Sequence, residues 1–190
     1  MPKFIKRLLI LTALGGLTFV SLTALSNALK PVAVTTELAG EGAAVQIYGA
    51  NVWGVRGRFA IHTWIATRAQ NETTFTIHQI IGWKLRRNGT ALDVSWGDPK
   101  RDWYRSPPIL LHEVVGDEAH SLVTDVRRAV NTYPYADTYT MWPGPNSNSF
   151  TEWVALEVPA LALVLPFKAI GKSWMQDNHG LGADMTAMAE

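Results

Sequence analysis

Two neighbouring runs of β-branched and aromatic residues limit this chain's fold more than any other feature of the sequence. Residues 58–67 and 73–83 are both rich in such side chains, and apolar and polar residues partly alternate along each run. The polar stretch 70–72 lies between them and suits a turn. The pattern predicts an antiparallel hairpin. Alternation along the first strand would give one face to Phe59, Ile61, Thr63 and Ile65 and the other to Ala60, His62, Trp64 and Ala66.

The rest of the chain adds helices to this sheet. Apolar residues recur at helical spacing through 117–131, with Asp117 as the expected cap and Pro134 beyond the end. A second helix is expected from Asn146 or Ser147 through residue 158. Further expectations are short strands at 44–48, 110–115 and 139–142, an irregular surface excursion at 86–108 pinned by Trp96, Trp103 and Tyr104, and a packed loop followed by a tail at 159–190. The predicted fold class is α+β: a small antiparallel sheet with two main helices packed on it, preceded by an N-terminal hydrophobic segment.

The N-terminus predicts export. Cations within the first seven residues precede an uncharged, mostly apolar run, Leu8–Leu25. This run approaches the length of about 20 residues that spans a bilayer core. Ser26 and Ala28 permit cleavage after Ala28, so segment 1–28 is either a signal peptide or an uncleaved membrane anchor. Either form places the remaining chain in the periplasm or on the extracytoplasmic face of the inner membrane.

Length and composition bound the remaining possibilities. The 190 residues suffice for one domain, and we divide them into segment 1–28, a linker at 29–44, a single α+β domain at 45–175 and a flexible tail at 176–190. The net charge is only +1, and the N-terminal segment holds the basic excess, which argues against nucleic acid as a partner. The chain has no cysteine, which excludes disulfides, thiolate zinc sites and a cysteine nucleophile. It contains no Gly-rich phosphate loop and no H-E-x-x-H motif, so we expect neither a cofactor nor a metal.

Two features are candidates for a functional site. His62 lies within the first predicted strand, where a histidine is most often a satisfied core residue. The run Trp142–Phe150 contains two prolines and a glycine that fix a tight turn into a helix, followed by small polar side chains. Free backbone N–H groups at such a helix start form an anion or oxyanion site. The alternative is plain capping by Ser147 or Asn148, with Phe150 as a core anchor.

Several segments together resemble a known family. They are Phe59–Ile65, Gly82-Trp83, Tyr133-Pro134-Tyr135, Trp142–Phe150 and Ala169–Lys172. Over about residues 45–175 the chain resembles the bacterial family of unknown function numbered 3750. The resemblance implies a bacterial origin and a cell-envelope setting, and it carries no activity.

A more distant similarity concerns the order of two motifs. Circularly permuted papain-like amidases and acyltransferases, of the NlpC and lecithin-retinol-acyltransferase type, place a histidine on an early strand and an Asn-Cys-x-x-Phe motif at a later helix start. Here His62 comes first, and Asn146-Ser147-Asn148-Ser149-Phe150 follows. The similarity implies Ser147 as nucleophile and His62 as general base. Backbone N–H groups near Ser147 and Asn148 would hold the oxyanion, and His78 or Asp137 would orient His62. Serine in place of cysteine needs a true general base, because its hydroxyl has a far higher pKa.

Two hypotheses of different class follow. In the first, which we prefer, the domain is a noncatalytic binding or structural module of the envelope, with a groove near His62 and the Trp142–Phe150 motif. Its ligand would be a peptide, glycan or lipid, and it would contact the membrane through segment 1–28 if that segment is uncleaved. The residues expected to bind the ligand are Trp64, Trp83, Trp142 and Asn146. In the second, Ser147 and His62 hydrolyse or transfer an envelope amide or ester.

Overall fold

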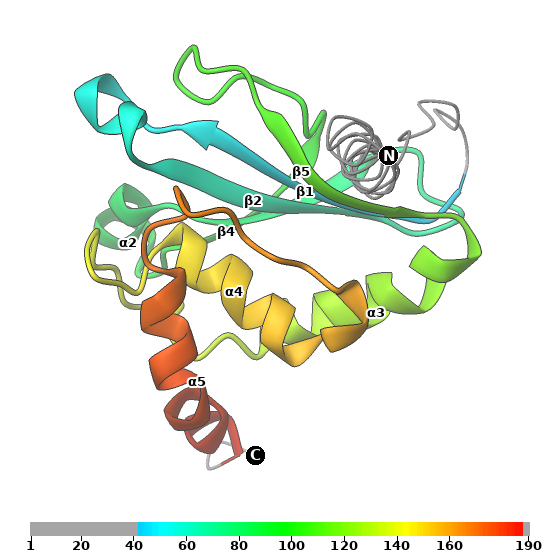
Figure 1. Cartoon of the computed structure of the whole chain (residues 1–190). Coiled ribbons are helices and arrows are strands. Elements are labelled where there is room, and N and C mark those ends of the chain that lie inside the picture. Colours follow the sequence, from blue (N-terminus) through cyan, green and yellow to red (C-terminus); the bar gives the residue numbers. More distant parts are fainter. Residues whose placement is uncertain (1–41, 188–190) are drawn as a thin grey trace, which may run out of the picture. The chain divides into compact units, whose positions relative to one another are not determined.

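Five antiparallel strands form one sheet in the order β4-β3-β2-β1-β5 (Figure 1). The computed structural model describes residues 42–187, with side chains as far as Gly180. The strands are β1 (Ala44–Asn51), β2 (Ile61–Arg68), β3 (Phe75–Ile80), β4 (Leu92–Gly97) and β5 (Ile109–Val115). The helices are α2 (Gly82–Asn88), α3 (Asp117–Asn131), α4 (Ser147–Glu157) and α5 (Lys172–Ala187), with short 3-10 helices η1 (Gly54–Arg58) and η2 (Pro159–Leu161). The predicted α+β class is confirmed.

The predicted export segment 1–28 and the linker up to residue 41 lie outside the described residues. Among the helices that are described, none has both the length and the apolar character needed to cross a membrane.

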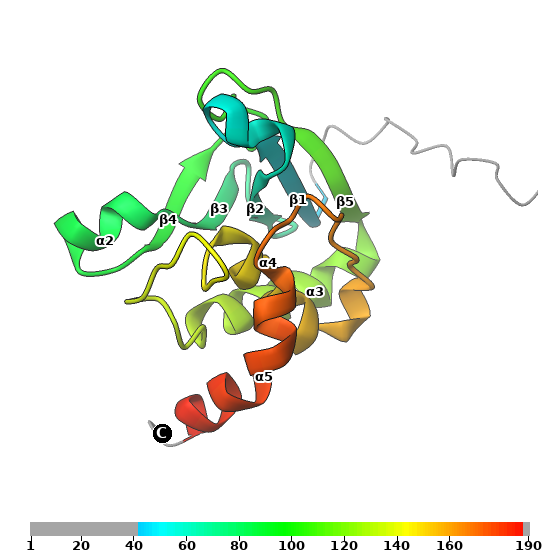
Figure 2. The same cartoon turned by 60° about the vertical axis from the view of Figure 1, so that its left-hand side comes forward.

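Helices α3 and α4 cover one face of the sheet, as Figures 1 and 2 show from two directions. The predicted apolar stripe of α3 is buried there, through Ala119, Leu122, Val123, Val126, Ala129 and Val130. The indole N–H of Trp153 on α4 donates to the carbonyl of Ala129 at 2.9 Å, which joins the two helices. Tyr133 and Phe150 pack edge to face in the same core, with ring centroids 5.1 Å apart. Both predicted main helices are therefore confirmed.

The opposite face of the sheet carries a smaller buried apolar cluster of Tyr48, Ala50, Trp64 and Ile77. Trp103, from the loop between β4 and β5, packs against this cluster. The indole N–H of Trp64 donates to the carbonyl of Pro99 at 3.0 Å and holds the same loop down. Trp103 therefore pins the loop as predicted, whereas Trp96 is 74% exposed and does not.

The predicted hairpin is formed by β2 and β3, with Ile65 opposite His78. The predicted alternation holds from Ile61 onward, because the Thr63 hydroxyl contacts α4 while Trp64 joins the opposite cluster. Phe59 and Ala60 were expected in the strand but precede it, and Phe59 is 70% exposed.

Three elements differ from the sequence prediction. Gly82 and Trp83 were expected at the end of a strand but begin α2, where the ring of Tyr139 lies against Gly82 so closely that a Cβ atom would come within 2.5 Å of it. The expected irregular excursion 86–108 contains strand β4, which pairs with β3 along its whole length. A strand was expected at 139–142, but the chain turns there, closed by Thr140 N–H donating to Pro145 O at 2.8 Å.

The predicted loop and tail at the C-terminus are replaced in part by helix α5. Figure 1 shows that α5 begins beside the start of α4 and points away from the sheet. Met175 on α5 is fully buried, and Gln176 donates to Glu152 of α4 at 2.6 Å. The bond joins residues 24 positions apart. Together with the burial of Met175, it stabilises a helix whose own sequence has only a weak apolar stripe.

Candidate functional site

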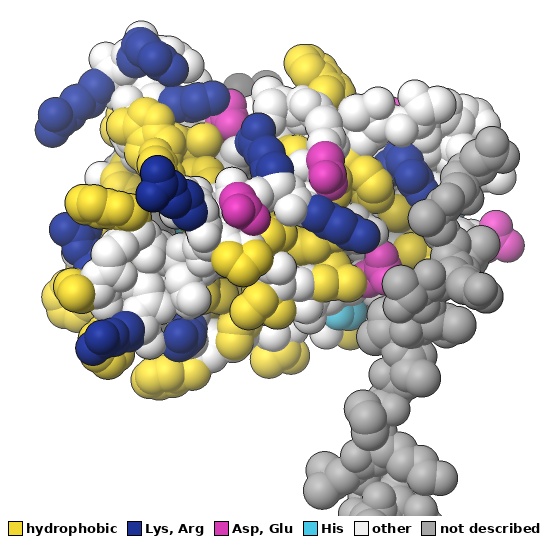
Figure 3. All heavy atoms as spheres, turned by 90° about the horizontal axis from the view of Figure 1, so that it is seen from above, with side chains coloured by type: hydrophobic (Ala, Val, Ile, Leu, Met, Phe, Trp, Pro, Cys, Tyr) yellow, Lys and Arg dark blue, Asp and Glu magenta, His cyan; other side chains and the backbone are white. Residues whose placement is uncertain are grey.

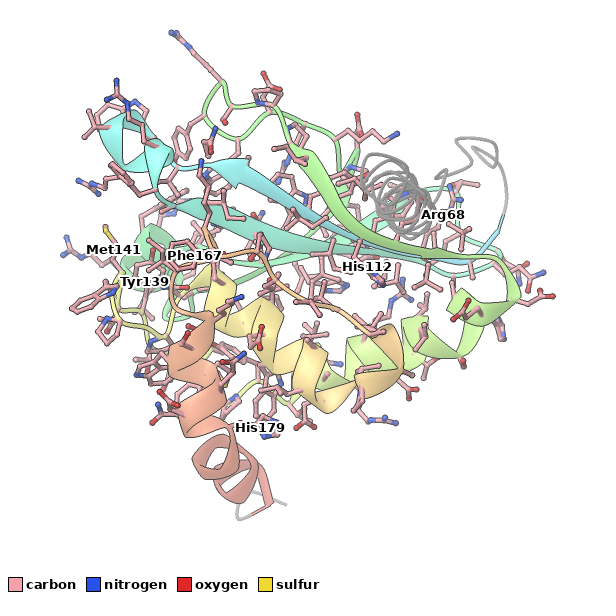
Figure 4. The ribbon with its side chains drawn as sticks, in the orientation of Figure 1. Arg68, His112, Tyr139, Met141, Phe167 and His179 are labelled. Atoms are coloured by element: carbon pink, nitrogen blue, oxygen red, sulfur yellow. The ribbon has the colours of Figure 1, made fainter. Side chains whose placement is uncertain are left out.

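A cavity of about 650 Å³ opens at the end of the domain where β2 begins. Its wall comes from η1 and the residues flanking it, the starts of β2, α2 and α4, the loop between β4 and β5, the turn before α4, and Ile170. Figure 4 shows Tyr139 and Met141, two of the lining residues, at this end of the molecule. Six of the residues predicted for the site contribute to the wall: His62, Trp83, Trp142, Asn146, Ser147 and Asn148. The structure therefore brings together segments 85 positions apart, as both hypotheses require.

Trp64 is the predicted ligand-binding residue that does not line the cavity. It is only 3% exposed, stacks on Tyr48, and is covered by Trp103. Trp64 is therefore a structural residue of the apolar cluster on the sheet face that α3 and α4 do not cover.

Asn146 and Asn148 line the cavity, but their side chains form hydrogen bonds with other groups of the protein. Asn146 caps α4: its Oδ1 accepts from the N–H groups of Asn148 at 2.9 Å and Ser149 at 3.2 Å. Its Nδ2 donates to the carbonyls of Met141 and Ile170. The Ser149 hydroxyl accepts from Asn146 N–H at 3.2 Å, which completes a capping box. Asn146 is therefore the N-cap residue, and the predicted alternative of capping by Ser147 or Asn148 is wrong.

Asn148 ties α4 to β2. Its Nδ2 donates to the carbonyls of Ile61 at 3.0 Å and Ile170 at 2.8 Å, and its Oδ1 accepts from the Thr63 hydroxyl at 3.0 Å. Both amides are at most 5% exposed. Neither amide has a spare donor for a ligand, because both N–H groups of each side chain are already used.

Gly171 explains how the chain passes so close to Asn146. A Cβ atom at this position would lie 2.3 Å from Asn146 Nδ2, and the backbone has φ of +105°. Both conditions favour glycine.

His62 is held by a chain of polar groups on the face of the sheet away from α4. Its Nε2 lies 3.0 Å from Gln79 Oε1, and Gln79 Nε2 donates to Asp93 at 3.1 Å. Lys84 pairs with the same carboxylate. Because the carboxylate can only accept, Gln79 must turn its oxygen to His62, and His62 carries its proton on Nε2. The His62 ring stacks on Trp103 with centroids 3.7 Å apart.

Burial sets the charge of His62. Loss of solvent around the ring lowers the pKa of His62 to about 4, although the bond to Gln79 opposes this shift. At neutral pH the imidazole is therefore uncharged, and its free nitrogen Nδ1 is a weak base.

Ser147 and His62 line the same cavity but reach it from different sides of the sheet. The hydroxyl of Thr63, the neighbour of His62, lies 3.2 Å from the Ser147 carbonyl oxygen, so the Thr63 side chain is on the face of the sheet that α4 covers. Successive side chains of a strand point to opposite faces, and His62 points to the other one. Within residues 42–180, the Ser147 hydroxyl forms no hydrogen bond, and none joins it to His62. The structure thus brings the two residues to one cavity without forming a dyad.

The residues expected to orient His62 lie elsewhere. His78 is bound to Thr67 at 3.0 Å on the α3 side of the sheet, near Arg127. Asp137 is exposed in the loop after α3. Gln79 takes this position instead, and alternation along β3 could have identified it, because a residue next to His78 faces the other side.

The sequence also did not identify most of the aromatic wall. Trp103, Tyr104, Tyr139 and Phe59 line the cavity beside the predicted Trp83 and Trp142, and Arg56 is the one cation in its lining. No lining residue is acidic. Across the described part of the chain, no group of three or more His, Asp or Glu residues is placed to hold a metal ion.

Comparison with known proteins gives one match. A family model described as "Protein of unknown function (DUF3750)" matches residues 42–174. Neither a curated protein nor a solved structure matches the chain. The matched range includes the first three residues of α5 and every segment that lines the cavity.

Proposed function

Since the chain belongs to the DUF3750 family of proteins of unknown function, we infer its role from the cavity. We propose that the protein is a noncatalytic binding module of the bacterial cell envelope, and that its ligand is an acyl chain. The observation that carries this proposal is the aromatic and aliphatic wall of the 650 Å³ cavity. Cavities of about 300–1,000 Å³ with mostly apolar walls are typical of small-molecule sites.

The polar groups of the wall favour an acyl chain over a peptide or glycan. Peptide N–H and C=O groups and sugar hydroxyls need hydrogen-bond partners once they leave water. The amides of Asn146 and Asn148 are already engaged with the backbone of the protein. An acyl chain needs no such partners and gains free energy from contact with Trp83, Trp103 and Tyr104.

The charge of the cavity lining favours a ligand with one polar or anionic end. Arg56 is exposed on η1 and lines the cavity, and no acidic residue accompanies it there. A carboxylate or phosphate at the end of an acyl chain would find a partner in its guanidinium group. The envelope setting rests on the apolar N-terminal run Leu8–Leu25.

The serine hydrolase alternative rests on Ser147 and His62 lining one cavity. It is the weaker candidate for two reasons. The nitrogen of His62 that bears the proton is bound to Gln79, and burial lowers the pKa of the ring to about 4. A general base works best with a pKa near the working pH.

Binding can be tested with a fluorescent polyene fatty acid, such as cis-parinaric acid, titrated into the full chain without vesicles. We expect saturable binding, weakened about 10-fold by Trp83→Ala, because an aromatic anchor in a binding pocket contributes roughly 1–2 kcal/mol. Trp96→Ala is the matched control. Trp96 is also an exposed tryptophan, at 74%, but it does not line the cavity.

Equal effects of the two tryptophan variants, or no saturable binding, would refute the acyl-chain proposal. The hydrolase alternative has a separate readout. Covalent labelling by a fluorophosphonate that Ser147→Ala abolishes would support catalysis and replace the noncatalytic interpretation.

A further inference from the structure

Six large apolar side chains are exposed to solvent on the segments that supply the cavity lining. We call them the aromatic rim: Trp53, Val55, Phe59, Met141, Trp142 and Phe167. They are between 58% and 95% exposed, and Phe167 is the most exposed of them. Single exposed apolar residues need no explanation, but a cluster of this size marks an interaction surface.

Close contacts between the segments show that the rim is one surface. Arg56 of η1 approaches the Met141 sulfur at 3.5 Å, which places the segment around η1 beside the turn before α4. Ile61 N–H donates to the Lys168 carbonyl at 3.1 Å, which places the segment of Phe167 beside the start of β2. Asn146 joins the carbonyls of Met141 and Ile170. Figure 4 shows Met141 and Phe167 toward the same end of the molecule.

The three segments that supply the rim carry charges of one sign. Segments 52–61, 139–143 and 164–170 supply the rim and contain the cations Arg56, Arg58 and Lys168 but no acidic residue. All three cations are exposed, and within the described residues none forms an ion pair. Figure 3 shows hydrophobic and basic side chains mixed at the left-hand end of the upper face.

We propose that the aromatic rim docks this end of the domain on the surface of an anionic lipid bilayer. Tryptophan and phenylalanine insert at the boundary between headgroups and acyl chains, where basic side chains meet lipid phosphates. A neutral protein partner would explain the apolar side chains but not the unpaired cations among them. In the docked orientation the entrance of the cavity would face the membrane. The docking proposal is argued from the rim alone and does not require acyl-chain binding.

The absence of cysteine from the chain allows a site-specific test. Phe167→Cys in the full chain is labelled with the environment-sensitive fluorophore NBD and mixed with vesicles that carry brominated acyl chains. We expect the label to be quenched by vesicles of phosphatidylcholine and phosphatidylglycerol, and much less by phosphatidylcholine alone. The control is the same label at Thr124→Cys, an exposed position on α3, where no quenching is expected even if the N-terminal segment inserts.

Charge reversal tests the electrostatic part. Arg58→Glu and Lys168→Glu, each in the labelled Phe167→Cys background, should lower the ratio of docked to undocked protein at least fivefold, as expected from about 1 kcal/mol for each cation near an anionic surface.

The proposal fails if the label at position 167 is no better quenched than that at position 124, or if anionic lipid and the reversed charges have no effect. A concentration-dependent blue shift of the label without vesicles would instead assign the rim to a second copy of the chain. Loss of fatty-acid binding with normal quenching would refute only the acyl-chain proposal.

Discussion

Asn146→Ala is expected to lower the free energy of unfolding by about 3 kcal/mol, a large fraction of the stability of a domain of this size. The side chain makes four hydrogen bonds while 5% exposed. Loss of the helix cap costs about 1 kcal/mol, and each of the two buried bonds to Met141 O and Ile170 O contributes roughly another 1 kcal/mol. The variant also leaves the carbonyl of Met141 without the amide partner that it has in the native protein.

Ser147→Ala is the matched control for this experiment. Ser147 is the next residue and equally buried, but its hydroxyl has no hydrogen-bond partner within residues 42–180. Its replacement should change the free energy of unfolding by no more than about 0.5 kcal/mol. Chemical denaturation followed by tryptophan fluorescence measures both. If Ser147→Ala were the more damaging change, the capping arrangement described for α4 would be wrong.

Acidification from pH 7 to pH 5 should destabilise the domain. Burial lowers the pKa of both His62 and His78 from 6.5 to about 4, and the positive charge of Arg127 adds to the effect at His78. Between these values the unfolded chain binds protons that the folded chain does not. Stability is therefore fully present above about pH 7 and falls as the pH drops through 6.5, with the loss complete below about pH 4.

The expected size of this effect is about 2 kcal/mol for each histidine at pH 5, or about 4 kcal/mol in total relative to pH 7.5. Denaturation curves at the two pH values measure it. The bond to Arg127 lowers the pKa of the Glu72 carboxyl, whose contribution is lost only below its ordinary value of 4.5. The comparison at pH 5 therefore isolates the histidines. A free energy of unfolding that is the same at both pH values would contradict their burial as neutral groups.

A variant of His62 measures how much of this pH dependence comes from that residue. His62→Gln keeps a neutral side chain in the cavity wall and should remove about half of the pH dependence, whatever it does to the stability at pH 7.5. An unchanged pH dependence in this variant would mean that His62 is accessible to protons in the folded protein.

Much of the fold could be predicted because its signals are local. The apolar residues of α3 recur at helical spacing, and Asn146 with Ser149 and the proline-rich turn marks the start of α4. Alternation along β2 correctly assigned Thr63 and Trp64 to opposite faces. Strand β4 was not predicted because turn residues surround six residues with weak alternation, and its pairing with β3 is what makes it a strand.

The sequence alone determined the α+β class, the two main helices, the hairpin and the family resemblance, because these depend on periodicity and on short motifs. Only the tertiary structure decided how the site residues are used. His62 meets Gln79 across 17 positions, and Asn148 meets Ile61 across 87. Which partner a buried polar group finds depends on the packing of distant segments, which local propensity does not encode. For that reason His62 and Ser147, which the order of two motifs related in the sequence, lie in one cavity without bonding to each other.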